Sequence, residues 1–256
     1  VEADRLADRF WPGPLTLVLP KAPDLPDIVT AGGRTVGVRM PDHPLALALI
    51  ESFGGPIVGP SANPSGYVSP TTAGHVRDHF DEATVYVLDG GACRAGIEST
   101  VLDLTRTVPI VLRRGVIGAG EIAGVLGCEV DEPPGETTEP SGEAVASPGV
   151  LGPHYQPRSC VMVVERPEDI ERALETAAGP AAVLSGPGRP TRVGPPNIVF
   201  QMPFSAVAYA GSLYAVLREA DATRPALIIV VLPRSDDSPI WRAVRDRLMR
   251  AAAPGL

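Results

Sequence analysis

The feature that most constrains the fold is a break in the middle of the chain, at residues 129–157, where the hydrophobic pattern of the flanking regions disappears. This stretch is rich in proline and glycine and has no periodic run of apolar residues, which is typical of an extended linker that is partly polyproline II-like. The regions on both sides alternate strand and helix patterns. We therefore expect two α/β parts, joined by a linker that is either a passive tether or a functional lid.

The region before the break predicts a mixed α/β domain with one sheet. Short runs rich in aliphatic and β-branched residues indicate strands at 15–20, 35–41, 56–59 (a short buried strand), 84–90, 99–105 and 109–115. Helices are expected at 44–54, closed by Gly54, at 69–80 behind Ser and Thr caps, and at 118–127. The opening residues VEADRLADRFW have the pattern of a helix interior and no initiator Met precedes them, so we expect a fragment.

The region after the break, residues 158–256, alternates again and predicts a small Rossmann-like α/β domain. Its expected strands and helices, in chain order, are 160–165, 167–179 (helix), 181–185, 197–203, 205–221 (helix), 226–233 and 238–252 (helix). The run ALIIVVLP is continuously apolar, which is typical of a parallel strand covered on both faces. The region contains no GxGxxG fingerprint, so we assign it no dinucleotide site.

Charge and cysteine content exclude several classes of protein. With 22 Lys and Arg against 30 Asp and Glu, the net charge is −8, so the overall field attracts neither nucleic acid nor an anionic membrane. A local basic pocket for a nucleotide remains compatible with this charge. Three widely spaced cysteines form no CxxC pair and no disulfide framework, which favours a reducing cytoplasm. No apolar run reaches about 18 residues, so the sequence predicts no membrane span.

The segment GPSANPSG, residues 59–66, is the first candidate for chemistry. Its small residues allow backbone N–H groups to approach the oxygens of a ligand closely, and Ser61 and Asn63 add polar side chains. Its two prolines stiffen the turn. A plain surface loop rich in turn-forming residues is the alternative, and the residues of this segment by themselves leave it open.

Polar residues on the predicted strands are the next candidates. In TVGVRMP, Thr35 and Arg39 alternate with valines and share one face, and an arginine fork suits a carboxylate or a phosphate. Ser99 and Arg113 are 14 residues apart, on adjacent predicted strands, and are placed to converge on one ligand. A solvated strand face explains the same pattern. Within the linker, Tyr155 needs a partner surface, because a linker has no core of its own to fill.

Other patterns do not reach the level of a site. His75 and His79 have the i, i+4 spacing of helical metal ligands, but no HExxH motif is present and Arg77 lies between them. Ser61 has no evident base partner, so a serine-hydrolase triad is not expected. We therefore assign no metal ligand and no catalytic side chain.

Eight blocks, in this order, resemble the YrdC-type threonylcarbamoyl-AMP synthases in their long two-domain form. They are FWPGPLTLVLP, TVGVRMPDHP, PIVGPSANPSG, SPTTAGHV, GIESTVLDL, VLRRGVI, SPG…HYQP and AYAGSLYAVLREAD. Together they cover nearly the whole chain, which makes the match far more specific than any one block. The resemblance implies a partial YrdC-like catalytic domain at 1–128, a linker or lid at 129–157 and a Rossmann-like domain at 158–256.

The resemblance also implies a reaction. L-threonine takes up bicarbonate or CO2 as a carbamate, which attacks the α-phosphorus of ATP to give threonylcarbamoyl-adenylate and pyrophosphate. A nucleotidyltransferase of this kind would use ATP as substrate with Mg2+, act in the cytoplasm, and supply the tRNA-threonylcarbamoyl transferase machinery that makes t6A at position 37 of tRNA. Direct contact with RNA is left open, and no membrane is involved.

Site residues follow from the resemblance only where the blocks match. It implies that L-threonine is bound by Thr35, Arg39 and Ser99. It implies that ATP is bound by Gly59, Ser61, Asn63, Ser69, Arg113 and Tyr155, the last as part of a lid. The basic phosphate cluster of the family's first portion is not found in this sequence, and Lys21 lies outside that motif. We therefore expect the fragment alone to be inactive.

Two alternatives remain. A carbamoyl-AMP-forming domain of the hydrogenase-maturation type shares the expected fold, but the SPG…HYQP linker and the C-terminal α/β region disfavour it. A non-catalytic RNA-binding or regulatory module is disfavoured by the charge of −8.

Overall fold

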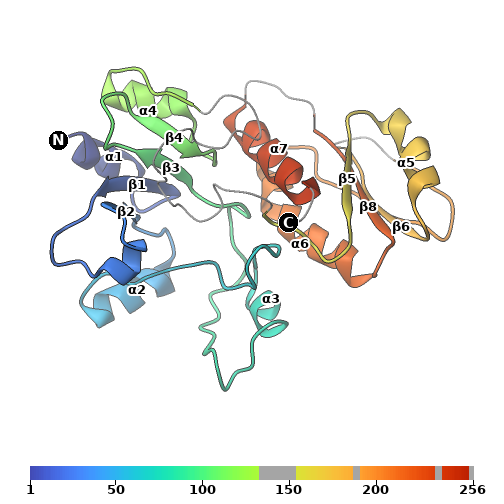
Figure 1. The fold of residues 1–256 in the computed structure, drawn as a ribbon, viewed down its shortest axis with the longest axis horizontal. Helices are drawn as coiled ribbons and strands as arrows, with labels where there is room; N and C mark the ends of the chain where they lie inside the picture. Colours follow the sequence, from blue (N-terminus) through green and yellow to red (C-terminus); the bar gives the residue numbers. More distant parts are fainter. Residues whose placement is uncertain (133–153, 187–190, 234–237, 254–256) are drawn as a thin grey trace. The chain divides into compact units, whose positions relative to one another are not determined.

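The structure is a computed structural model that describes residues 1–132, 154–186, 191–233 and 238–253. Contacts divide the chain into two compact units that do not follow its order (Figure 1). The first unit comprises Val1–Pro60 and Glu98–Gly152, and the second comprises Ser61–Ile97 and Pro153–Leu256. Each unit is described by itself. Most of the expected linker, residues 133–153, lies outside the described residues, and the domain limits expected from the sequence stay a prediction.

The first unit contains a four-stranded mixed sheet in the order β2-β1-β3-β4. Its strands are β1 (Leu15–Pro20), β2 (Thr35–Val38), β3 (Thr100–Asp103) and β4 (Ile110–Arg113). Strand β1 is antiparallel to β2 and parallel to β3, and β3 is antiparallel to β4. All four strands lie where the sequence predicts them, each within the expected range.

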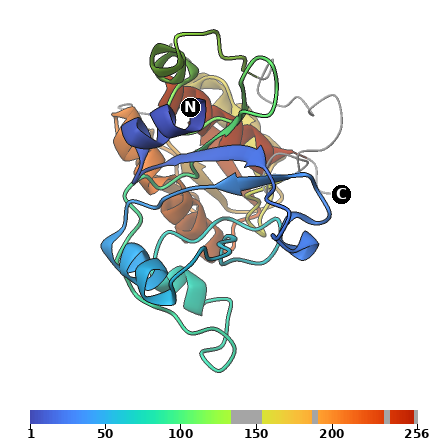
Figure 2. The same ribbon diagram turned by 90° about the vertical axis from the view of Figure 1, so that its left-hand side faces the viewer.

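Helices cover this sheet on one side more fully than on the other. The helical elements are α1 (Glu2–Phe10), η1 (Asp27–Thr30), α2 (Pro44–Phe53) and α4 (Ala119–Leu126). Helices α1 and α4 pack together on one side of the sheet, and α2 lies toward the other (Figure 2). The core between the sheet and these two helices is built from aliphatic side chains, among them Leu6, Leu17, Leu102 and Ile122. Gly54 adopts the left-handed conformation that closes α2, as expected.

The second unit contains a four-stranded, all-parallel sheet in the order β5-β8-β6-β7. Its elements are β5 (Val161–Val164), η2 (Pro167–Asp169), α5 (Ile170–Thr176), β6 (Ala181–Leu184), β7 (Ile198–Phe200), α6 (Ala206–Ala222), β8 (Leu227–Val231) and α7 (Pro239–Ala252). Helices α6 and α7 cover one face and α5 covers the other (Figure 1). Strand β8 is entirely buried between its parallel neighbours, as its continuous apolar sequence predicts.

Residues 61–97 belong to the second unit, although they precede the last two strands of the first sheet. They contain α3 (Ala73–Arg77), which is shorter than the expected helix at 69–80 but has the expected cap, because the Thr72 side chain accepts a hydrogen bond from the His75 N–H. At Gly96, whose φ is +70°, an added Cβ would lie 2.3 Å from the carbonyl oxygen of Ala210 in α6. The segment therefore packs closely against α6.

Two expected strands, 56–59 and 84–90, are wrong. Neither forms a strand in the structure, and their apolar side chains are largely exposed, 67% for Val58 and 90% for Tyr86. Strand propensity mainly reports how well a side chain fits a half-buried pleated surface, and neither segment pairs with a strand of either sheet. In the part of the chain that the structure describes, no helix has the length and apolar character needed to cross a bilayer.

Candidate functional site

The candidate residues of the first unit gather on one face of its sheet. The register pairs Val18 with Gly37 across β1 and β2, and Thr16 with Val101 across β1 and β3. Directly paired residues share a face and alternate residues of a strand return to it. Thr35 therefore lies on the same face as Thr16, and this is the face opposite Leu17 and the α1–α4 core.

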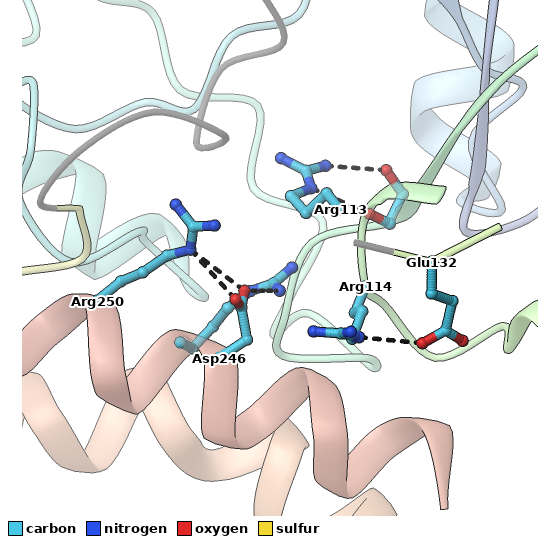
Figure 3. Close-up of polar contacts among 7 residues, drawn as sticks. Arg113, Arg114, Glu132, Asp246 and Arg250 are labelled. Atoms are coloured by element: carbon cyan, nitrogen blue, oxygen red, sulfur yellow. Dashed lines mark hydrogen bonds and ion pairs between the residues drawn. The ribbon is translucent and has the colours of Figure 1, made fainter. Parts of the chain in front are cut away.

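Ser99 and Arg113 converge, as their positions in the sequence predict. Ser99, which directly precedes β3, is 3% exposed, and its Oγ lies 2.8 Å from Thr16 Oγ1. Arg113, at the end of β4, donates from Nε to the Ser99 carbonyl oxygen (3.1 Å) and from Nη2 to Ser99 Oγ (3.2 Å) (Figure 3). The neighbouring Arg114 turns to Glu132 instead, at 3.2 Å. The result is a buried hydroxyl between a second hydroxyl and a guanidinium, a set able to bind an anion or a polar ligand.

Thr16 is a member of this cluster that the sequence analysis missed. Its signal was present, because it is the one polar residue inside the apolar strand LTLVLP. Strand β2 packs closely on β1 beside Thr16, because an added Cβ on Gly37 would lie 3.2 Å from Thr16 Cγ2. Thr35 is half-buried at the start of β2, and Arg39 is exposed just after its end.

The segment GPSANPSG forms no regular element, and the chain passes from the first unit to the second between Pro60 and Ser61. Gly59 and Ser61 are exposed. Asn63 holds the turn together, because its Nδ2 donates to the carbonyl oxygens of Pro64 (2.9 Å) and Tyr67 (3.0 Å). Its buried Oδ1 has no hydrogen-bond partner among the described residues. Ser69, the last of the candidate ATP residues near this turn, is only 8% exposed.

A polar network that the sequence analysis did not foresee follows this turn. Tyr67 donates its hydroxyl to Asp221 Oδ2 at 2.8 Å, and the Arg218 guanidinium lies 4.9 Å from the Tyr67 ring centroid. Burial and the bond to Asp221 raise the pKa of Tyr67 to about 12. Burial works to raise the pKa of Asp221, but hydrogen bonds from Ser159, Tyr67 and Arg158 outweigh it, so this pKa is lowered. Both ionisable side chains thus keep one protonation state near neutral pH.

These residues line an open pocket of about 710 Å³ in the second unit. Its lining includes the basic residues Arg158, Arg218 and Arg224 and the acidic residues Asp78 and Asp221. His79 also lines it, and desolvation together with Arg218 and Arg158 lowers the pKa of His79, which favours the neutral imidazole. The mixed charge of the walls shows that the pocket is no simple anion hole.

Tyr155 packs on the kind of partner surface that the sequence predicts for an aromatic residue within the linker 129–157. Its side chain is 1% exposed, and its ring stacks on Tyr214 of α6, with centroids 5.4 Å apart and an interplanar angle of 24°. The guanidinium of Arg247 in α7 lies 5.7 Å from the Tyr155 ring. Arg247 is held in turn by Asp246, which also accepts from Arg250 (Figure 3). Tyr155 is therefore a packed residue of the second unit.

Metal-ligand geometry is not found among the described residues, where no group of three or more His, Cys, Asp or Glu side chains lies close enough to hold an ion. The histidines with i, i+4 spacing, His75 and His79, contact other side chains and the backbone. His75 Nδ1 accepts from the Thr71 N–H at 3.2 Å, and His79 Nε2 lies 3.1 Å from Arg218 Nη1.

Two family models match the chain. One described as "Telomere recombination" (Sua5_yciO_yrdC) matches residues 1–115, and one described as "Threonylcarbamoyl-AMP synthase, C-terminal domain" matches residues 117–253. Among curated relatives, the threonylcarbamoyl-AMP synthase of Pyrococcus abyssi is 38% identical and that of Bacillus subtilis is 37% identical. Both alignments cover 98% of this chain, and they cover 74% and 73% of the relatives.

Solved structures give the same result. The crystal structure of Pyrococcus abyssi Sua5 complexed with L-threonine superposes with a TM-score of 0.86 at 39% identity, covering 98% of this chain and 74% of the other. A variant of that protein, in which an adjacent histidine and tyrosine are replaced by alanine, gives 0.84 at 36% identity, covering 98% and 72%. The expected two-part α/β fold is thereby confirmed.

Proposed function

Because this chain belongs to the threonylcarbamoyl-AMP synthase family, we propose that it joins L-threonine, bicarbonate or CO2, and ATP into threonylcarbamoyl-adenylate, releasing pyrophosphate. The observation that carries the proposal is the likeness, over 98% of the chain, to a solved relative complexed with L-threonine. The enzyme is a transferase of the nucleotidyltransferase type, and its product serves the t6A modification of tRNA. Cytoplasmic action and hand-over to a separate threonylcarbamoyl transferase complete the proposal.

L-threonine is assigned to the polar face of the first sheet, at Thr35, Arg39 and Ser99. Arg39 matches the substrate carboxylate with a fork of two N–H donors. Ser99 offers a hydroxyl that is already oriented by Thr16 and Arg113. The opposite face of the sheet packs against the α1–α4 core, and this face carries the hydroxyls beside a smaller buried cluster of Val18, Val101 and Leu112.

ATP is assigned to the backbone of Gly59 and to a set of side chains. These are Ser61, Asn63, Ser69, Arg113 and Tyr155. The contacts of two of these residues limit how they could take part. Both N–H donors of Asn63 are used inside the turn, so only its Oδ1 remains for a ligand. Tyr155 is packed on α6, and the solved variant with a substituted His–Tyr pair draws attention to the dipeptide His154–Tyr155.

The chemistry requires no enzyme nucleophile. The threonine amine adds to CO2 and loses a proton to give a carbamate. A carbamate oxygen then attacks the α-phosphorus of ATP, and the bond to the pyrophosphate oxygen breaks. Hydroxyls, guanidinium groups and backbone N–H groups hold the reactants in line and stabilise charge on the phosphoryl oxygens. Mg2+ enters as part of the MgATP substrate, where it offsets phosphate charge. The chain's own side chains bind and orient.

The test measures pyrophosphate release from ATP by the full-length protein, with L-threonine and bicarbonate added separately and together. The proposal predicts rapid release only when both are present. Equal release without threonine would overturn the threonine-specific reaction and would favour a carbamoyl-AMP-forming enzyme. No release under any combination, from protein shown to bind ATP, would overturn the synthase activity itself.

A further inference from the structure

Helix α6 carries a stripe of three buried polar or aromatic side chains that the reaction above does not use. Tyr214, Arg218 and Asp221 are spaced i, i+4 and i+7, so they lie one above the other on one face of the helix. They are 1%, 8% and 7% exposed. An arginine and an aspartate on a helix are normally solvated, and burying them requires that their hydrogen bonds be satisfied. We call these three residues the α6 stripe.

Arg218 binds the backbone near the end of residues 59–69, which we call the signature region. Its Nη2 donates to the Val68 carbonyl oxygen at 2.6 Å, and its Nε points to the Ser69 carbonyl oxygen at 3.4 Å. Its Nη1 meets His79 Nε2 at 3.1 Å, and desolvation lowers the pKa of Arg218. The guanidinium thus binds the main-chain carbonyl groups of Val68 and Ser69 and also contacts the His79 ring.

Asp221 holds two separate stretches of chain at once. Its Oδ2 accepts from the Tyr67 hydroxyl at 2.8 Å and from the Arg158 N–H at 3.2 Å. Its Oδ1 accepts from the Ser159 N–H at 2.8 Å. One carboxylate therefore ties the signature region to the stretch that follows Tyr155.

Two further contacts connect residues 155 and 156 with α6 and with the signature region. The ring of Tyr214 stacks on Tyr155, and the Gln156 N–H donates to the Gly66 carbonyl oxygen at 2.8 Å, beside an isolated parallel bridge between Tyr67 and Gln156. Residues 66–69 and 155–159 are therefore held side by side, and the α6 stripe contacts both.

We propose that the α6 stripe is a positioning device for the nucleotide, in which Arg218 fixes the backbone of residues 68 and 69, and Asp221 ties the Tyr67 side chain to the backbone of residues 158 and 159, close to Tyr155. The inference rests on the proposed function, which assigns Ser61, Ser69 and Tyr155 to ATP. A segment rich in Gly, Ser and Pro is costly to order when the ligand binds, and a displacement of about 1 Å at a reacting group costs on the order of 10²-fold in rate. Arg218 and Asp221 are not among the residues assigned to a substrate, and in this proposal they act through the segments they hold.

The charged character of the stripe supports positioning over simple packing. A helix that only had to cover residues 67–69 would do so at least as stably with apolar side chains, because burying a guanidinium and a carboxylate carries a desolvation cost. Apolar residues cannot fix the direction of the two carbonyl groups that Arg218 binds or of the two N–H groups that Asp221 binds. The α6 stripe therefore supplies orientation, and this is what an in-line displacement on ATP requires.

The test compares three variants of the full-length enzyme, Arg218→Met, Arg218→Lys and Tyr67→Phe, with Arg224→Gln as the matched control. Arg224 lines the same pocket, is exposed, and makes no side-chain contact in the described structure. We measure kcat and the separate KM values for ATP and threonine, below the melting onset of each variant. The expected result is an ATP KM raised about tenfold or more in Arg218→Met, partly restored in Arg218→Lys, raised about threefold in Tyr67→Phe, and unchanged in Arg224→Gln.

The threonine KM separates positioning from general damage, because the proposed threonine residues belong to the first unit and α6 belongs to the second. It should stay within twofold in every variant. Folded Arg218→Met and Tyr67→Phe enzymes with unchanged ATP KM and kcat would overturn the inference, as would parallel losses in both KM values. If Arg218→Met does not fold, the ATP KM and kcat of Tyr67→Phe test the inference, because this substitution removes only one hydroxyl group. Failure of the proposed function is recognised separately, by wild-type enzyme that shows no threonine-dependent release of pyrophosphate.

Discussion

The threonine candidates and the nucleotide candidates are built in two different ways. On the first sheet, Thr16, Thr35 and Ser99 are placed by strand alternation and register, so that neighbouring strands orient one another. The signature region has no regular structure, and its last residues, Val68 and Ser69, are held by the Arg218 side chain of α6, about 150 residues later in the sequence. The first arrangement is fixed by local periodicity, whereas the second depends on a distant helix.

The largest predicted effect, on the free energy of unfolding, comes from Gly96→Ala, which disrupts the packing of residues 61–97 on α6. The new Cβ would lie 2.3 Å from the Ala210 carbonyl oxygen, at a φ of +70° that side chains rarely adopt. We expect unfolding free energy to fall by about 3 kcal/mol or more. Gly91→Ala is the control, because its φ is also positive, at +85°, but nothing lies within 4 Å. It should cost only about 1 kcal/mol. Equal losses in denaturant titrations would show that 61–97 is not packed on α6.

Next in size is Arg39→Ala on the first sheet. Removal of the proposed fork to the threonine carboxylate should weaken threonine binding by about 1.5–3 kcal/mol, the usual value of a hydrogen bond to a charged group. Calorimetric titration with L-threonine measures it, and the exposed Arg34→Ala is the neighbouring control. An affinity that Arg39→Ala leaves intact would remove Arg39 from the site.

A smaller effect is expected from Thr16→Val, which keeps the shape of the side chain and removes the hydroxyl beside Ser99. The loss of one hydrogen bond should lower the unfolding free energy by about 1 kcal/mol. Because Ser99 Oγ is then oriented by Arg113 alone, threonine affinity should also fall by several-fold. Unchanged threonine affinity would limit Thr16 to a structural role.

The smallest effect concerns pH and the His79–Arg218 contact. Desolvation, Arg218 and Arg158 lower the pKa of His79 in the folded state, so the unfolded chain binds more protons there. The stabilising contribution is complete above about pH 6.5, the ordinary histidine pKa, and is lost as pH falls through the lowered folded value. His79→Gln should therefore reduce the slope of unfolding free energy against pH in mildly acidic buffer. An identical slope in both proteins would contradict this reading, with His75 supplying the remaining histidine contribution.

The contrast between strand-placed residues and a segment held by a distant helix also separates what the sequence predicts from what it does not. The strands and helices of both sheets were predictable because their side-chain periods are local, and Ser99 and Arg113 could be paired because they lie on adjacent strands. The wrong strands, 56–59 and 84–90, have the right composition but no neighbour to pair with. Arg218 and Asp221 could not be assigned a role, because nothing in the sequence of α6 indicates which distant carbonyls or N–H groups they meet.

The most direct test of the central claim is to identify the product by mass spectrometry after supplying ATP, ¹³C-bicarbonate and ¹⁵N-threonine to the full-length enzyme. We predict an adenylate that carries both labels, formed together with pyrophosphate and absent when threonine is omitted. An adenylate with the carbon label but without the threonine nitrogen, or AMP alone, would contradict the assignment of this chain as a threonylcarbamoyl-AMP synthase.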